Sequence, residues 1–295
     1  MTLFPGIGTR AVKTERLTVS ILERTADNAA APDSRTVVFV HGNLSSSVFW
    51  QEAMLALPHD VRAIALDLRG FGSSEALPVD ATRGLADFSD DLRATLSALE
   101  LRSAHLVGAA MGGGVILQHA LDYGALSLTL VSPISPFGFG GTRRDGELLT
   151  DDAAGTGGGT ANPDFVARLK AGDATDEHEA SPRTVFRGAY VSPSYSTAHE
   201  DEWVAAMLRT STAAGNYPGD SVESAHWPGF APGTTGVLNA MSPLFHNVSG
   251  IIDLPILPPV LWVQGTADAI VADASYSDVS YLAQQGLFPG GPGEG

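Results

Sequence analysis

The sequence contains no cysteine, only two lysines, and no long hydrophobic run. The absence of cysteine excludes disulfides, thiolate metal sites and a cysteine nucleophile. Seventeen basic and 33 acidic residues give a formal net charge of −16, which repels a phosphate backbone and an anionic lipid surface. No segment approaches the ~18 apolar residues of a membrane span, and the N-terminus does not resemble a secretory signal. We therefore expect neither a nucleic-acid nor a membrane partner, and a cytoplasmic location.

What the chain does have is enough apolar sequence for a large buried core. It has 295 residues, of which 44% are hydrophobic and 17% charged. Strand-like runs lie at residues 17–21, 36–40, 63–66, 104–107, 126–131 and 259–263, and helical patterns at 85–99 and 115–123. This alternation predicts an α/β fold with a mostly parallel, doubly wound sheet.

The strand pattern is interrupted between residues 136 and 249. This part has a Gly/Thr-rich stretch at 155–160, acidic segments near 173–179, and apolar residues without strand alternation. We therefore expect a core in two parts, 1–135 and 250–295, with an inserted cap at 136–249.

Ligands of doubly wound sheets bind at the carboxyl ends of the strands, where three loops are distinctive. The first is His41-Gly-Asn-Leu-Ser-Ser-Ser47, whose glycine permits a sharp turn that presents backbone N–H groups to an oxyanion. An ordinary glycine turn is the alternative. The second is Asp67-Leu-Arg-Gly-Phe-Gly-Ser-Ser74, in which we expect Asp67 and Arg69 to pair or to hold neighbouring backbone, a structural role.

The third loop, Gly108-Ala-Ala-Met-Gly-Gly113, lies between a buried strand and a helix. It fits the frame Gly-x-nucleophile-x-Gly, with small residues where the turn is crowded. Its apex is Ala110, which carries no nucleophilic group. The spacing differs from the Gly-x-Gly-x-x-Gly of dinucleotide-binding proteins.

Together with Gly265-Thr-Ala-Asp268, these loops occur in an order that resembles the α/β-hydrolase family, and the resemblance covers essentially the whole chain. It implies an α/β-hydrolase sheet with a cap. It also implies that Ala110 occupies the nucleophile position, which is serine in esterases and lactonases. By the same resemblance, the N–H groups of Asn43 and Met111 form the oxyanion hole, and Asp268 is the triad acid.

The chain departs from this family in two ways. Engineered removal of a serine, which would trap an uncleaved substrate, is the simplest explanation of Ala110. The family's histidine follows an eighth strand beyond the acid, but this sequence stops at Gly295 without one, so we expect either a truncated chain or a protein that works without it. Asp268 has an alternative role as the N-cap of the next helix, as does Asp273.

No other histidine is an evident replacement. We assign the catalytic base to none of the eight, which are His41, His59, His105, His119, His178, His199, His226 and His246.

The resemblance implies hydrolysis of a carboxylic ester or lactone by a Ser-His-Asp mechanism, here in an inactive form. The aromatic residues of 136–249 either fill the interior of the cap or roof a pocket for a bulky apolar substrate. We expect substrate contacts from Leu44, Phe137, Trp203 and Trp227.

Two other functions remain open. One is a non-catalytic protein that binds a small ligand and has alanine naturally at position 110. The other is an enzyme of the same fold that opens epoxides or haloalkanes with an aspartate there, or cleaves C–C bonds with a serine. We expect no cofactor and no metal, because the sequence has no convincing phosphate loop and no His/Asp/Glu group at ligand spacing. If the chain ends at Gly295, the open edge of strand 259–263 favours dimers or aggregates.

Overall fold

The computed structural model describes residues 2–24, 35–272, 274–275 and 278–287. Its centre is a seven-stranded sheet with the strand order β1-β2-β4-β3-β5-β6-β9. The strands are β1 Ile7–Lys13, β2 Thr18–Arg24, β3 Thr36–Val40, β4 Arg62–Leu66, β5 His105–Ala109, β6 Ser127–Val131 and β9 Val260–Val263. Strands β4, β3, β5, β6 and β9 are parallel, whereas β1 and β2 are antiparallel. The predicted fold class is therefore confirmed.

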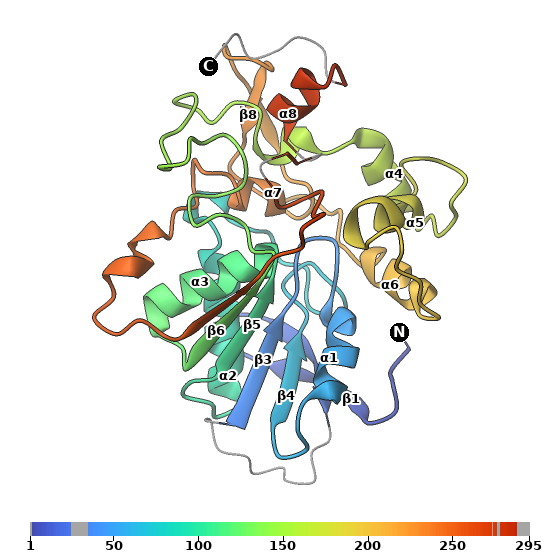
Figure 1. Cartoon of the computed structure of the whole chain (residues 1–295), viewed down its shortest axis with the longest axis vertical. Coiled ribbons are helices and arrows are strands. Elements are labelled where there is room, and N and C mark those ends of the chain that lie inside the picture. Colours follow the sequence, from blue (N-terminus) through green and yellow to red (C-terminus); the bar gives the residue numbers. More distant parts are fainter. Residues whose placement is uncertain (1, 25–34, 273, 276–277, 288–295) are drawn as a thin grey trace.

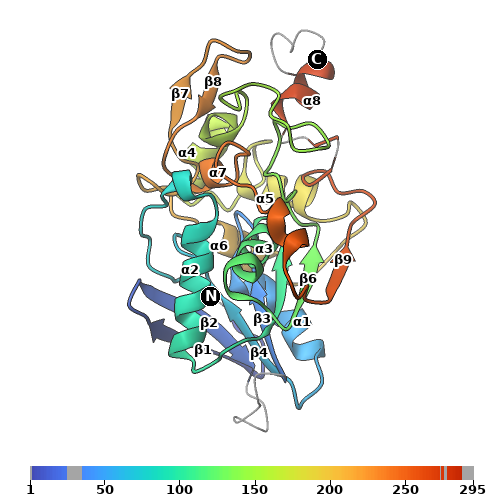
Figure 2. The same ribbon diagram turned by 90° about the vertical axis from the view of Figure 1, so that its left-hand side faces the viewer.

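Helices cover both faces of this sheet. Helices α2 and α3 pack side by side on one face and α1 lies on the other (Figures 1 and 2). The helices are α1 Gln51–Ala56, α2 Ala86–Ala98, α3 Met111–Tyr123, α4 Pro163–Ala171, α5 Pro182–Val185, α6 Glu200–Met207, α7 Val237–Ala240 and α8 Val279–Gln284. Both predicted helices are present, but α3 begins four residues earlier than the pattern indicated.

The sequence analysis missed β1, because its residues do not alternate in burial. Only Ile7 and Val12 of this strand are buried. An edge strand that is mostly solvated carries polar residues on both faces, so it shows neither the alternation nor the continuous apolar run that marks the predicted strands.

The segment 136–249 adds no strand to the seven-stranded sheet. It contains α4 to α7 and a small two-stranded sheet of β7 Ser221–Glu223 and β8 Phe230–Pro232. This segment lies beyond the carboxyl ends of the parallel strands (Figure 1). The division of the chain into a core and a cap stays a prediction.

A search for membrane spans among the described residues finds no helix with the necessary length and apolar character.

Within the described ranges, strand β9 lies at one edge of the sheet, and all four of its residues are exposed. The exposed fractions of Val260, Leu261, Trp262 and Val263 are 54%, 58%, 59% and 45%. An apolar edge strand presents unpaired backbone groups and uncovered side chains to a second chain.

We predict that the protein self-associates through β9. The double substitution Leu261→Lys with Trp262→Lys should shift it toward monomer in light scattering, because charge on an edge strand opposes pairing. The matched control is Ile256→Lys with Leu257→Lys, which alters two exposed apolar residues outside the strand. A monodisperse monomer of the unaltered chain contradicts the prediction.

Candidate active site

Ala110 occupies a sharp turn between β5 and α3. Its backbone angles are φ 48° and ψ −116°, a conformation that an L-residue rarely adopts. Such a residue costs of the order of 1–3 kcal/mol unless the surrounding structure imposes it. The turn imposes this backbone conformation, and an alanine at position 110 adopts it only with strain.

Glycines allow the turn to be this tight. A Cβ atom on Gly112 would overlap the carbonyl oxygen of Val40, and one on Gly108 would overlap the carbonyl of Gly112. A Cβ on Gly113 would lie 2.6 Å from Cβ of Pro133. The first turn of α3 consequently packs backbone to backbone against the ends of β3 and β5.

His41 fixes the loop that follows β3. Its Nε2 accepts a hydrogen bond from the Leu68 N–H at 3.0 Å, so the proton lies on Nδ1, which donates to the Gly42 carbonyl at 2.7 Å. The ring is buried, and this burial lowers the pKa of His41. A neutral histidine with both nitrogens bonded to backbone has a structural role.

Asp67 joins two of the motif loops. Its carboxylate accepts one hydrogen bond from the Ser47 N–H at 2.8 Å and another from the Ser73 N–H at 2.9 Å. Arg69 pairs instead with α2, where its Nε lies 2.6 Å from the Asp91 carboxylate. The sequence left open whether Asp67 pairs with Arg69 or binds neighbouring backbone. The structure shows that its carboxylate binds backbone N–H groups and does not pair with Arg69.

A cavity of about 1380 Å³ lies at the carboxyl ends of the strands. Six of the eight predicted site residues line it, namely Asn43, Leu44, Ala110, Met111, Trp203 and Asp268. Phe137 and Trp227 are not among the lining residues. Phe137 packs against Gly146 within its own loop, and Trp227 lies in the turn between β7 and β8.

Two backbone N–H groups beside the turn have no acceptor within the described part of the chain. Neither the Asn43 N–H nor the Met111 N–H donates a hydrogen bond to any of the described residues. Met111 is the first residue of α3, where the helix offers no partner and its dipole favours negative charge. The Asn43 carbonyl accepts a hydrogen bond from the Tyr190 hydroxyl at 3.2 Å. This bond links the loop after β3 to the segment 136–249.

Asp268 is held by its own loop. Its Oδ1 accepts hydrogen bonds from the N–H groups of Ile270 and Val271, both at 2.9 Å, and its Oδ2 accepts one from the Gln264 amide at 3.3 Å. The N-cap of the next helix, α8, is Asp278, so Asp268 does not have that alternative role. Asp273 lies outside the described residues.

No histidine in the cavity is available as a base. Of the eight in the sequence, all of which are described, only His41 lines the cavity, and backbone occupies both of its nitrogens. The arrangement therefore offers an acid, two N–H donors and a turn that lacks a reactive side chain.

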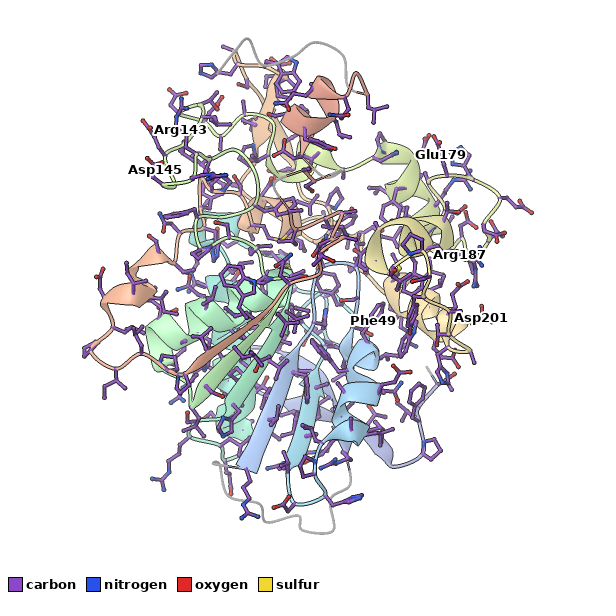
Figure 3. All side chains as sticks on the ribbon, viewed as in Figure 1. Phe49, Arg143, Asp145, Glu179, Arg187 and Asp201 are labelled. Carbon is purple, nitrogen blue, oxygen red and sulfur yellow. The ribbon has the colours of Figure 1, made fainter. Side chains whose placement is uncertain are left out.

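The sequence analysis missed several aromatic residues of the cavity. Phe49 packs on Trp203 with ring centroids 5.3 Å apart, and Phe186 stacks on Tyr190 at 6.5 Å. Figure 3 shows Phe49 near α1, facing the part of the chain that carries α5 and α6. The number of apolar residues in a sequence does not reveal which aromatic side chains face a cavity. These residues could therefore be identified only from the packing of the folded chain.

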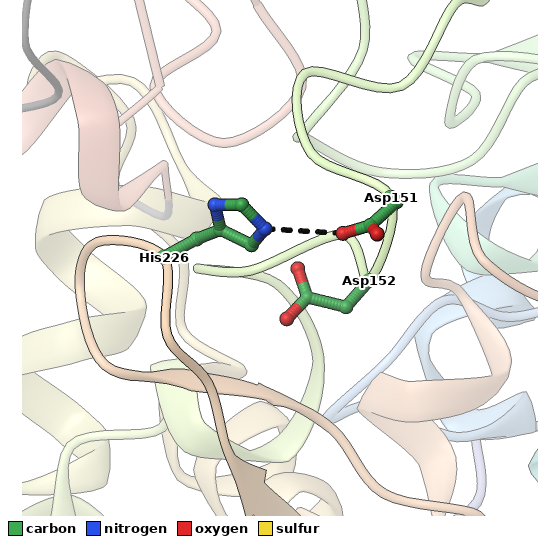
Figure 4. Close-up of side chains that lie close together, drawn as sticks. All are labelled: Asp151, Asp152 and His226. Carbon is green, nitrogen blue, oxygen red and sulfur yellow. Dashed lines mark hydrogen bonds and ion pairs between the residues drawn. The ribbon is translucent and has the colours of Figure 1, made fainter.

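One group of potential metal ligands lies outside the cavity lining. Ligand atoms of Asp151, Asp152 and His226 lie within 4.8 Å of one another, and His226 Nε2 is 3.1 Å from the Asp151 carboxylate (Figure 4). This group was not predicted from the sequence, because 75 residues separate His226 from Asp151. Asp151 and His226 are exposed and bond each other, whereas the Asp152 carboxylate accepts hydrogen bonds from the Ser224 hydroxyl and the Ala154 N–H.

Comparison with known proteins identifies the family. Residues 35–285 match the family model described as alpha/beta hydrolase fold, and the chain belongs to that family. Carboxylesterase YbfK of Bacillus subtilis is 30% identical over 89 residues, which are 30% of this chain and 30% of that protein. A protein assigned as carbamate hydrolase RutD in Pantoea ananatis is 38% identical over 99 residues, 34% of this chain and 36% of the relative.

These matches span only about a third of the relatives' length. Among solved structures, a hydrolase from Pseudomonas aeruginosa has a TM-score of 0.53 at 17% identity and covers 91% of this chain and 83% of its own. A membrane phospholipase A has a TM-score of 0.53 at 18% identity, with coverage of 96% and 76%. These structures support the fold, and the sequence relatives are hydrolases.

We predict that Ala110→Gly stabilises the protein by about 1 kcal/mol, because glycine adopts a positive φ without strain. The matched control is Ala109→Gly at the end of β5, which should destabilise by about 0.5–1 kcal/mol. Urea unfolding measures both. Equal destabilisation by the two variants contradicts a strained turn at Ala110.

We also predict that the protein loses stability as the pH falls below about 6.5. Burial lowers the pKa values of His119 and His246 to about 4. Between about pH 4 and pH 6.5, both side chains are therefore protonated in the unfolded chain and neutral in the native state. In this window each group lowers the free energy of unfolding by about 1.4 kcal/mol per pH unit.

Urea unfolding at several pH values checks this. His246→Leu should reduce the change in the free energy of unfolding per pH unit by the contribution of about one proton. The substitution breaks no hydrogen bond, because neither ring nitrogen of His246 has a partner among the described residues. A free energy of unfolding that does not change between about pH 7 and pH 5 contradicts the prediction.

Proposed function

We propose that this chain is built as an ester or lactone hydrolase whose nucleophile position is occupied by alanine. The observation that carries the proposal is the strained turn at Ala110, which shares a cavity with the unpartnered N–H groups of Asn43 and Met111. A strained backbone at this position has no use for an alanine side chain. It has a use for a nucleophile, because the turn directs the nucleophile's side chain away from the sheet.

The chemistry would be a two-step acyl transfer. With a hydroxyl at position 110, a base removes its proton and the oxygen attacks the ester carbonyl. The alcohol leaves with that proton, and water then attacks the acyl group, which releases the carboxylic acid and restores the hydroxyl. The N–H groups of Asn43 and Met111 stabilise the negative charge on the carbonyl oxygen. Asp268 orients the base. The segment 136–249 acts as a cap, and Leu44 and Trp203 contact the substrate.

With Ala110 in place, the chain binds its substrate without turning it over. Loss of a triad member costs about 10⁴ to 10⁶ in kcat, so hydrolysis should be close to background. A protein that only binds a small ligand is the second candidate, and the alanine itself favours it. Phe137 and Trp227 are not proposed as substrate contacts.

The test restores the nucleophile. Ala110→Ser, incubated with the neutral activated ester p-nitrophenyl butyrate, should gain one butyryl group at residue 110 by mass spectrometry, because the oxyanion donors act without the base. The matched control is Ala109→Ser, which places the hydroxyl one residue before the apex, still in the cavity lining. It should gain none.

Two results contradict the proposal. One is equal labelling of the two variants. The other is hydrolysis by the unaltered chain at ordinary esterase rates. Ala110→Asp, assayed on haloalkanes and epoxides, distinguishes the other enzymatic alternative, since an aspartate nucleophile would open those substrates.

A further inference from the structure

Apart from the neutral His41, the titratable acids and bases among the described lining residues, tyrosines aside, are all carboxylates. They are Glu52, Glu179, Asp268 and Asp278, and no lysine or arginine is among the described lining residues. Asp268 and Asp278 are half-buried and Glu52 and Glu179 are exposed, so a ligand in the cavity meets negative charge that solvent screens only in part. This cavity therefore disfavours an anionic ligand.

The arginines of the segment 182–190, which also supplies lining residues of the cavity, do not offset this charge. Arg183 lies 2.6 Å from the Glu200 carboxylate, and Arg187 lies 2.7 Å from it. Arg187 also pairs with Asp176 at 2.8 Å. Figure 3 shows Arg187 and Glu179 on the same part of the chain, but Glu179 has no arginine partner among the described ion pairs.

Aromatic rings form a second feature of the same cavity. Phe49, Phe186, Tyr190 and Trp203 all line it and contact one another as a continuous group. The face of an aromatic ring attracts an organic cation, and it accepts the alkyl groups of an ammonium at the same time. Carboxylates together with aromatic walls suit a cation better than a neutral group.

We propose that this cavity selects ligands that carry an organic ammonium group, and in particular esters of ammonium-bearing alcohols. The ester part rests on the proposed function. The preference for positive charge rests on the carboxylates and the aromatic walls alone.

Binding to the unaltered chain tests the proposal, because Ala110 leaves an ester intact. Three benzoates of similar shape differ only in charge: benzoylcholine, its neutral carbon analogue 3,3-dimethylbutyl benzoate, and anionic 2-sulfoethyl benzoate. Isothermal titration calorimetry should give the tightest Kd for benzoylcholine, about tenfold tighter than for the neutral ester. The anion should bind more weakly still, and added salt should narrow the differences.

A charge-matched pair of double variants locates the effect. Glu52→Gln with Glu179→Gln removes two lining carboxylates and should weaken benzoylcholine binding severalfold while sparing the neutral ester. Asp145→Asn with Glu147→Gln makes the same change of net charge on an exposed loop outside the lining (Figure 3), and should alter binding less than twofold.

Equal affinity for the three benzoates, a preference for the neutral or anionic one, or no binding of any overturns the inference. So does an equal effect of the two double variants. The labelling of Ala110→Ser uses a neutral ester and does not depend on this preference. If Ala110→Ser is labelled but the three benzoates bind equally, only the ammonium preference is wrong. If benzoylcholine binds most tightly but Ala110→Ser is not labelled, only the hydrolase proposal is wrong.

Discussion

The close approach of α3 to the ends of β3 and β5 is the constraint on which the site depends. Backbone meets backbone there, so Gly108 and Gly112 cannot carry a side chain without collision. The chain can then enter the helix only through a residue with positive φ, which is Ala110. The same geometry leaves the Met111 N–H without a partner at the end of the sheet where the cavity lies.

The strands that could be predicted from sequence are those that carry a continuous apolar run or an apolar alternation. Strand β3 is almost entirely buried and reads as a continuous apolar run, whereas β1 is solvated and left no pattern. The start of α3 was placed too late because Gly112 to Gly114 have low helix propensity and no apolar period. Packing against the sheet, not propensity, makes them helical.

The lining of the cavity was predictable where a backbone geometry demands particular residues. The glycine frame pointed to Ala110 and Met111 and the loop after β3 to Asn43, and all three line one cavity. The roles that the family resemblance implies for them stay predictions. The aromatic contacts were not predictable in the same way, because side-chain direction depends on how the segment 136–249 packs. Trp203 faces the cavity, whereas Phe137 packs within its own loop.

The most direct test of this account is a crystal structure of the unaltered chain with an intact aryl ester. The account predicts that the ester carbonyl oxygen lies about 3 Å from the backbone nitrogens of both Asn43 and Met111, with the carbonyl carbon over Ala110. An ester carbonyl bound elsewhere in the cavity, with these two N–H groups unoccupied, would contradict it.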